Sequence, residues 1–220
     1  MSGCCGPEDY DEDYDEVFDD RFAGRVARGY RRRGLDRTRR RIVDFVSDHG
    51  LEDATVLEIG GGVGELHVEL LRRGARAATN LEISAGYEHE ATRLLEQTGL
   101  RDRVTRRRVD IAVTPDDVPD ADVVVLHRVV CCYPDAERLL AAASRHARRL
   151  LVFSHPPRNV LTRSLIALEN SGRRLRGRGF RAYVHVPEAM VASVEATGLV
   201  VRHRRRGLAW TVVGLERPGR

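Results

Sequence analysis

A glycine-rich turn around residues 56–65 carries the clearest chemical signal in the chain. It reads Val-Leu-Glu-Ile-Gly-Gly-Gly-Val-Gly-Glu, which sets Glu58 two residues before a glycine run made of Gly60, Gly61, Gly62 and Gly64. A dinucleotide fingerprint that starts at the first of these glycines needs another at position 65, where this chain has glutamate. Glycines without a Cβ let a loop backbone approach a ligand closely. We therefore expect a cofactor-cradling turn between a buried strand and a helix.

Two acidic residues follow at the ends of the next two predicted strands. Glu82 lies 22 residues after Gly60 and is followed by Ile83. A carboxylate near that spacing can accept hydrogen bonds from a pair of ribose hydroxyls. Asp110 and Ile111 stand in the same way after the third strand. The three strand ends together predict one nucleoside-binding edge.

The pattern Glu58-x-Gly60-x-Gly62-x-Gly64 resembles the first motif of the class I S-adenosylmethionine-dependent methyltransferases. The resemblance implies that the glycine loop cradles the methionine and ribose parts of the cofactor, and that the glutamate before it organises the loop or reaches the cofactor ammonium through water. It further implies roles for residues that follow the later strands. Glu82 would hold the ribose, Ile83 would pack on adenine, Asp110 would bind the adenine amino group, Ile111 would cover the ring, and His127 would complete the contacts.

Later segments resemble the magnesium protoporphyrin IX O-methyltransferases. They are Gly34-Leu-Asp-Arg-Thr38, Cys132-Tyr133-Pro134, Phe153-Ser-His-Pro156 and Arg181-Ala-Tyr-Val-His185. This resemblance implies an N-terminal arm over the active site and a helical insertion after the fifth strand. The family has a histidine where this chain has Cys132, and its arm tyrosine has only Tyr10, Tyr14 and Tyr30 as candidates here. We expect the architecture of that family without its porphyrin substrate.

Three residues near the ends of strands four and five are candidates for acid–base chemistry. His127 could take a substrate proton, because an imidazole titrates near neutral pH, or it could cap the strand end. His155 could serve as a base or anchor its proline-flanked loop, and Tyr133 could act in catalysis or pack under the next helix. Arg128 could bind a substrate carboxylate through two hydrogen bonds, or form a surface ion pair.

Composition excludes several function classes. All 37 basic residues are arginine, so lysine Schiff-base chemistry and the lysine-dependent phosphate loop are ruled out. Residues 8–20 hold nine carboxylates and residues 21–41 hold ten arginines. Such arginine runs can bind nucleic acid, but here they come without a platform of aromatic residues for stacking bases, and the acidic run can neutralise its basic neighbour. We therefore expect a small-molecule partner and disfavour nucleic acid.

The cysteines form two adjacent pairs, Cys4-Cys5 and Cys131-Cys132. Neighbouring cysteines rarely bridge each other, and without a CxxC spacing no metal site is expected. The acidic N-terminus is unlike a signal peptide and no apolar run is long enough to span a membrane, so we expect a reduced, cytoplasmic protein. A folded arm could bring the two pairs together as a soft-metal site or a redox latch.

The elements that must position these residues alternate along the chain. Short apolar runs predict strands over residues 54–59, 75–81, 103–109, 121–126, 149–153, 199–206 and 208–216. Helical spacing separates most of them and predicts helices over residues 36–49, 63–73, 85–97, 135–145, 159–171 and 187–197. This order predicts an α/β fold, a doubly wound and mostly parallel seven-stranded sheet with a closing antiparallel hairpin.

We divide the chain into an arm over residues 1–35 and a domain over residues 36–220 that carries a helical cap insertion at 159–185. The function expected is S-adenosylmethionine-dependent methylation of a small molecule, at oxygen, with a carboxylate or phenol as acceptor. Two alternatives stay open, an RNA-modifying methyltransferase and a non-catalytic cofactor-binding partner subunit. The sequence gives no oligomeric state.

Overall fold

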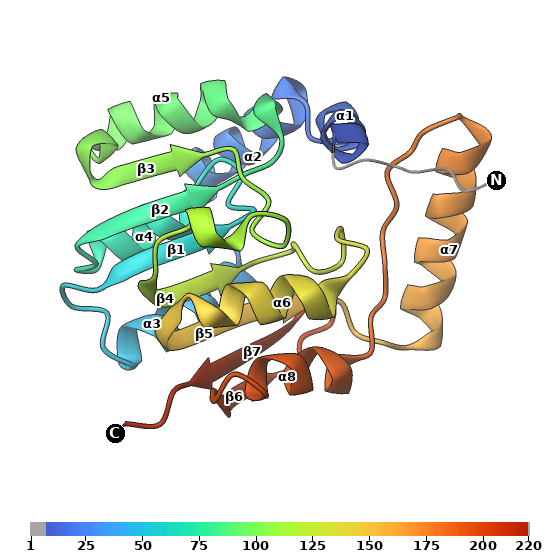
Figure 1. The fold of residues 1–220 in the computed structure, drawn as a ribbon. Helices are drawn as coiled ribbons and strands as arrows, with labels where there is room; N and C mark the ends of the chain where they lie inside the picture. Colours follow the sequence, from blue (N-terminus) through green and yellow to red (C-terminus); the bar gives the residue numbers. More distant parts are fainter. Residues whose placement is uncertain (1–7, 220) are drawn as a thin grey trace.

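A seven-stranded sheet forms the centre of the molecule (Figure 1). The computed structural model describes residues 8–219, with side chains from Asp13 onward. The strands are β1 (Thr55–Ile59), β2 (Ala77–Leu81), β3 (Val104–Arg107), β4 (Ala121–Leu126), β5 (Ala147–His155), β6 (Val200–Arg205) and β7 (Thr211–Glu216). Their order is β3-β2-β1-β4-β5-β7-β6, and only the pairings that involve β7 are antiparallel. The predicted fold class is confirmed.

Eight α-helices surround the sheet in the described residues. They are α1 (Glu8–Val17), α2 (Asp20–Arg33), α3 (Arg37–Asp48), α4 (Glu65–Arg72), α5 (Glu88–Thr98), α6 (Ala136–Arg145), α7 (Val160–Leu175) and α8 (Pro187–Glu195). Short 3-10 turns at Ala85–Tyr87, Arg101–Arg103 and Pro115–Asp117 complete the connections. None of these helices is long and apolar enough to cross a lipid bilayer.

The two faces of the sheet have separate apolar cores because strand side chains alternate. Val56, Val123 and Val152 point to the face covered by α3, α4 and α5. Their neighbours Leu57 and Val124 point to the other face, against α6 and α8. Both faces are therefore covered, as continuous apolar strands such as β4 require.

Local chemistry accounts for where elements begin and end. The expected cap at Asp36 is present, since its carboxylate accepts from the N–H groups of Thr38 and Arg39. The helix expected from residue 63 begins at Glu65, because Gly64 before it takes a left-handed φ of 95°. Strand β5 is longer than expected, because antiparallel pairing with β7 continues as far as His155.

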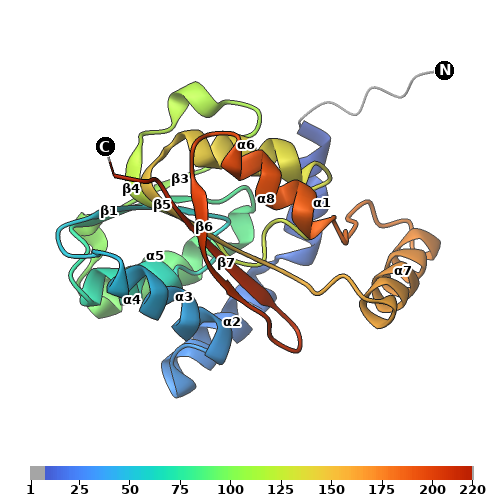
Figure 2. The ribbon, with the colours of Figure 1, turned by 90° about the horizontal axis from the view of Figure 1, so that it is seen from below.

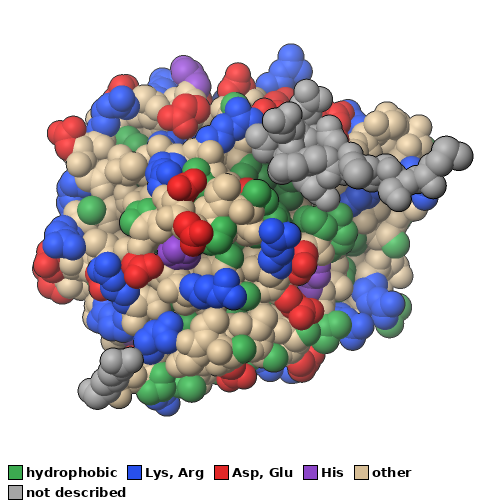
Figure 3. Space-filling view, viewed as in Figure 1, with side chains coloured by type: hydrophobic (Ala, Val, Ile, Leu, Met, Phe, Trp, Pro, Cys, Tyr) green, Lys and Arg blue, Asp and Glu red, His purple; other side chains and the backbone are tan. Residues whose placement is uncertain are grey.

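The described part of the arm consists of two helices, α1 and α2 (Figure 2). Its acidic residues pair with distant arginines, Asp15 with Arg108 at 3.5 Å and Glu16 with Arg178 at 2.9 Å. Acidic residues of the arm therefore form ion pairs with arginines far along the chain. These pairs link the arm to the body of the domain, in addition to any effect on the basic run next to it in sequence. On the face seen in Figure 3, acidic and basic side chains are interspersed, without a continuous basic patch.

Candidate functional site

The glycine loop leaves β1 through backbone conformations that favour glycine. Gly60, Gly62 and Gly64 have φ values of 62°, 55° and 95°, a region that costs other residues free energy. Space is equally limited, since a Cβ on Gly60 would lie 2.6 Å from Val129, and one on Gly62 would lie 3.1 Å from the Tyr87 ring. The N–H of Gly60 donates to the carbonyl of Leu81 at 2.7 Å, which fixes the loop to β2.

Glu58 at the end of β1 is buried and paired with a histidine. Its carboxylate accepts from the Nδ1–H of His67 at 2.6 Å and from the backbone N–H of the same residue at 3.2 Å. Both side chains are almost fully buried, so the pair fixes the start of α4 beneath the glycine loop. Sequence reasoning missed His67, whose only signal is a polar residue on the apolar face of a predicted helix.

Glu82 at the end of β2 reaches across to the glycine loop. Its carboxylate accepts from the N–H of Gly62 at 2.8 Å and from the N–H of Ser84 at 3.0 Å. Burial raises the pKa of Glu82, while these two hydrogen bonds act to lower it. The carbonyl of the neighbouring Ile83 accepts from the guanidinium of Arg108 at 2.9 Å. The carboxylate predicted to hold a ribose therefore lies against the predicted cofactor loop.

Asp110 lies beyond β3 and contacts Tyr133. One carboxylate oxygen accepts from the backbone N–H of Ala112 at 2.8 Å, and the other accepts from the Tyr133 hydroxyl at 2.9 Å. Ile111 beside it is buried in the α6 and α8 core. The structure thus joins Asp110, which was predicted to bind the cofactor, to Tyr133, which was predicted to act in catalysis. The Tyr133 hydroxyl hydrogen is donated to the Asp110 carboxylate.

Aromatic residues of the arm cover this edge of the sheet. Tyr14 donates its hydroxyl hydrogen to the Cys132 carbonyl at 2.5 Å and packs edge-on against Phe180. Phe18 stacks on Tyr87, whose ring lies against the glycine loop. Burial raises the pKa of Tyr14 above its ordinary value, so it stays protonated at neutral pH. Of the three arm tyrosines proposed from sequence, Tyr14 is placed over the site, Tyr30 bonds to Glu69 on α4, and the side chain of Tyr10 lies outside those described.

His127 follows β4 and is held by Ser154 on β5. The Ser154 hydroxyl accepts from the N–H of Arg128 at 3.0 Å and lies 2.8 Å from Nδ1 of the imidazole. Because the serine is fully buried, its own hydrogen is satisfied only by donating to Nδ1, which leaves the imidazole hydrogen on Nε2. Burial and two nearby guanidinium groups lower the pKa of His127 well below its ordinary value. The ring is neutral and offers a donor.

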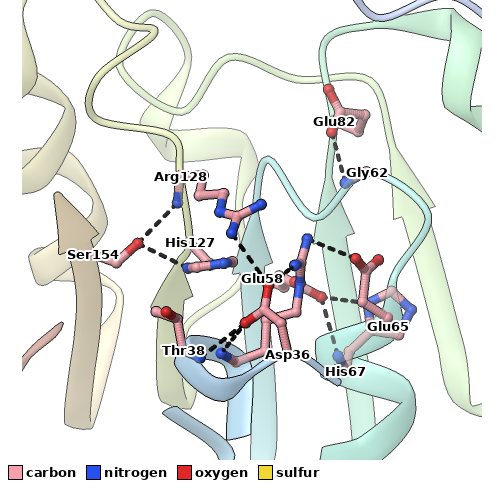
Figure 4. A network of polar contacts seen from close by, with 11 residues as sticks. Asp36, Thr38, Glu58, Gly62, Glu65, His67, Glu82, His127, Arg128 and Ser154 are labelled. Atoms are coloured by element: carbon pink, nitrogen blue, oxygen red, sulfur yellow. Dashed lines mark hydrogen bonds and ion pairs between the residues drawn. The ribbon is translucent and has the colours of Figure 1, made fainter. Parts of the chain in front are cut away.

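A charged network surrounds His127 (Figure 4). Arg128 pairs with Asp36 at 3.2 Å, and Arg39 bridges the same carboxylate and Glu65, the latter at 2.7 Å. Arg128 has a φ of 61°, a strained backbone for arginine, and its guanidinium lies over the Trp210 ring. The network links the start of α3, the glycine-loop helix and the end of β4. Sequence reasoning missed Arg39, which lies just beyond the Gly34–Thr38 segment, and it gave Ser154 no role although it named the segment Phe153–Pro156.

His155 lies apart from the other candidates. Successive β5 side chains alternate, so Ser154 faces His127 whereas His155 faces α8 and the β6–β7 hairpin. Its Nδ1–H donates to the Pro156 carbonyl at 2.8 Å, and its Nε2 has no partner among the described residues. Burial lowers the pKa of His155. The three candidate bases therefore do not converge on one point.

The Cys131 and Cys132 thiols are free, with their sulfurs 3.6 Å apart. Cys4 and Cys5 lie outside the described residues, so the latch between the pairs stays a prediction. No group of three or more metal-ligating side chains occurs in the part of the chain that the structure describes.

Comparison with known proteins places this geometry in a family. A family model described as a methyltransferase domain matches residues 28–204. No curated protein matches the sequence significantly. Among solved structures, the magnesium protoporphyrin IX methyltransferase of Synechocystis PCC 6803 with bound S-adenosylhomocysteine is similar, with a TM-score of 0.66, 21% identity and 82% of each chain covered.

Two further solved structures are similar. An O-methyltransferase family protein from Burkholderia thailandensis gives a TM-score of 0.66 at 20% identity, over 84% of this chain and 57% of that one. The geranyl diphosphate C-methyltransferase of Streptomyces coelicolor A3(2) gives 0.60 at 15% identity, over 80% and 78% of the two chains. At these identities the likeness establishes the fold, while the two substrates that these names give, magnesium protoporphyrin IX and geranyl diphosphate, differ.

Proposed function

The chain belongs to the family of proteins with a methyltransferase domain, and from this premise we propose that it binds S-adenosylmethionine and methylates a small molecule at oxygen. The observation that carries the proposal is the contact between Glu82 and the glycine loop at the carboxyl edge of the sheet. The similar structures with this cofactor or its product bound support the same ligand here.

The residues at this edge fit such a ligand. An ionised carboxylate offers about four acceptor positions, and Glu82 and Asp110 each use only two of them in the described contacts. Each can therefore still accept hydrogen bonds, the first from ribose hydroxyls and the second from an adenine amino group. The glycines keep the loop backbone free of side chains on the side where a ligand would lie. Glu58, paired with His67, acts as the support of the loop.

When bound, S-adenosylmethionine supplies a methyl group on a sulfonium sulfur, so the protein has mainly to align the acceptor and exclude water. The arm excludes water from the site, because Tyr14 and Phe18 cover the edge of the sheet. Tyr133 positions Asp110 by donating to it and keeps its own proton there. In the contacts described, these residues bind and orient their neighbours.

The end of β4 favours an acceptor that is already anionic. His127 is neutral with its hydrogen on Nε2, and Arg128 beside it carries a positive charge. A donor and a cation suit a carboxylate oxygen, which needs no base before it attacks the methyl carbon. We therefore place a carboxylate ahead of a phenol as the acceptor, with His127 and Arg128 as its binding groups.

The cofactor part is tested by calorimetric titration with S-adenosylhomocysteine. We expect micromolar binding that weakens about tenfold or more in Glu82→Gln, since the variant loses a charged acceptor. Glu195→Gln is the matched control, because Glu195 is an exposed carboxylate at the end of α8. Equal binding by wild type and Glu82→Gln would overturn the assignment of the site.

The acceptor part is tested without knowing the molecule. The protein is incubated with a small-molecule extract and methyl-labelled cofactor, and the products are treated with alkali. Methyl esters release labelled methanol, whereas aryl ethers and methylated amines do not. Label that stays in base-stable products would contradict a carboxylate acceptor. Glu82→Gln run in parallel shows that the label depends on the proposed site.

A further inference from the structure

A cleft lined by arginines lies beyond the carboxyl end of β5, apart from the cofactor edge. It has a volume of about 410 Å³, within the usual range for small-molecule sites. Its lining comes from three parts of the chain: the end of β5 with the segment that follows it, the first turn of α8, and the β6–β7 hairpin. The groups proposed to bind the cofactor and the acceptor, Glu82, Asp110, His127 and Arg128, lie outside that lining.

The register of the sheet brings polar side chains from three strands into this cleft. Phe153 on β5 and Val213 on β7 are register partners, and both belong to the core on the α8 face. His155 and Thr211 pair two positions further along, so their side chains point to the same face. Arg204 on β6 pairs with Val213 and also shares this face. The three polar residues line the cleft together because of this register.

The lining has an excess of positive charge. Three arginines, Arg158, Arg204 and Arg206, stand against a single carboxylate, Glu188, which leaves two positive charges in excess, three minus one. None of the three arginines forms an ion pair within the described residues. The amino end of α8 borders the same cleft at Pro187, and no side chain caps it. Free guanidinium groups and an uncapped helix amino end both favour a bound anion.

The imidazole of His155 adds a buried acceptor to this basic lining. Its Nδ1–H donates to the Pro156 carbonyl at 2.8 Å, and burial lowers the pKa of the ring, so Nε2 carries a lone pair. His155 is 4% exposed, and Nε2 has no partner among the described residues. A buried acceptor without a donor is unfavourable, and a hydroxyl group of a ligand would satisfy it. The arginines of the cleft are exposed, so their side chains can turn to admit a ligand to this atom.

Charge and acceptors together select the ligand. A phosphate monoester carries about −1.5 to −2 charges near neutral pH and so matches the two excess positive charges, whereas a carboxylate or a phosphodiester carries one negative charge. Sulfate has the charge but offers no hydroxyl hydrogen to His155 or Glu188. The volume of the cleft leaves room for an organic part beside the phosphate.

We propose that this cleft, the His155 cleft, binds a small phosphate monoester whose organic part carries hydroxyl groups, as in a sugar phosphate. The arginines and the amino end of α8 hold the phosphate. His155 and Glu188 accept hydrogen bonds from the hydroxyl groups. The site is separate from the cofactor edge, and the proposal does not rest on the methyltransferase reaction.

The test is calorimetric titration of the full-length protein in a buffer without phosphate. Glycerol 3-phosphate is the probe, and propyl phosphate, which has the same carbon chain and no hydroxyl group, is its matched comparison. We expect propyl phosphate to bind roughly tenfold more weakly, because it leaves the buried acceptor unpaired. Glycerol, which lacks the phosphate, should show no binding.

Two sets of variants separate the roles of the lining residues. In His155→Phe, which keeps a ring and removes both nitrogens, the preference for glycerol 3-phosphate over propyl phosphate should disappear. This comparison is made within one variant, so a change in overall stability does not affect it. Arg204→Gln/Arg206→Gln should bind both phosphates at least roughly tenfold more weakly. Arg93→Gln/Arg101→Gln removes two exposed arginines elsewhere and should bind like wild type.

Glu82→Gln distinguishes this site from the cofactor edge. We expect it to bind glycerol 3-phosphate like wild type, since Glu82 does not line the cleft. Circular dichroism checks the fold of every variant. Absence of glycerol 3-phosphate binding to wild type, or equal binding of the two phosphates to wild type, would overturn the proposal. So would binding that is lost in Glu82→Gln and kept in Arg204→Gln/Arg206→Gln, because the ligand would then lie at the cofactor edge.

Discussion

The two halves of the carboxyl edge of the sheet are built from different chemistry. At the carboxyl ends of β1, β2 and β3, carboxylates accept hydrogen bonds from nearby groups: Glu58 from His67, Glu82 from Gly62, and Asp110 from Tyr133. At the end of β4 stand a neutral imidazole, His127, and a cation, Arg128, which offer hydrogen-bond donors where the first half offers acceptors. The first half is suited to a fixed nucleoside ligand, and the second leaves polar atoms available for a variable acceptor.

The contrast also explains why the first half can be recognised in the sequence and the second cannot. A loop that must approach a ligand needs glycines at fixed positions, so its pattern can be read directly. A half that binds an acceptor needs only suitable donors at suitable places, and those come from separate elements. The predictions below test whether the difference between the halves is real, beginning with the largest expected effect.

Removing the histidine of the first half should be the most costly change. His67→Ala leaves the buried Glu58 carboxylate without its partner, and we expect the free energy of unfolding to fall by about 3 kcal/mol. Denaturant titration measures it. His146→Ala is the matched control, because His146 pairs with the exposed Asp120 and such pairs contribute at most about 1 kcal/mol. Equal losses in the two variants would mean that Glu58 and His67 do not form a structural pair.

A methyl group in the glycine loop should weaken cofactor binding more than it weakens the fold. In Gly60→Ala the new Cβ would meet Val129, and we expect roughly thirtyfold weaker binding of S-adenosylhomocysteine, about 2 kcal/mol. Gly99→Ala has a similar φ of 67° but open space around the Cβ, so it reports the backbone strain alone. Calorimetry should find normal affinity in that control. Normal affinity in Gly60→Ala as well would contradict a cradle at the loop.

The second half should show itself in how the free energy of unfolding depends on pH. His127 has a lowered pKa in the folded protein, so below the ordinary value near 6.5 the unfolded chain takes up a proton that the folded chain does not. Its contribution to stability is therefore present above that pH and is lost as the pH falls. Between pH 6 and pH 5 we expect wild type to lose up to about 1.4 kcal/mol more than His127→Gln, measured by denaturant titration at each pH. Parallel pH curves would show that His127 is not held neutral.

The smallest effect concerns the arm that covers both halves. Asp15 accepts from the hydroxyl of Ser84 and the N–H of Ala85, at 2.7 and 2.8 Å. In Asp15→Asn we expect about 1 kcal/mol weaker docking and correspondingly faster proteolysis within residues 8–33. Asp44→Asn, which removes only an exposed contact with Arg73, should be cleaved like wild type. Unchanged cleavage in Asp15→Asn would show that these contacts do not hold the arm.

The fold and the glycine-rich turn of the candidate site could be predicted because their causes are local. Apolar runs, the Asp36 cap and the glycine spacing each act within a few residues. The partners of the predicted residues could not be found in this way. Ser154 bonds to His127 across 27 positions, and Tyr14 bonds to Cys132 across 118, so only the folded chain brings them together. The separation of His155 from His127 depends on strand alternation, which the sequence shows only once the bounds of β5 are known.

The most direct test of the central claim is the crystal structure of the protein with S-adenosylhomocysteine bound. The account predicts the ribose hydroxyls within hydrogen-bonding distance of Glu82, the adenine amino group at Asp110, and the sulfur facing the end of β4 beside His127. A ligand bound elsewhere, or one whose ribose does not contact Glu82, would contradict it.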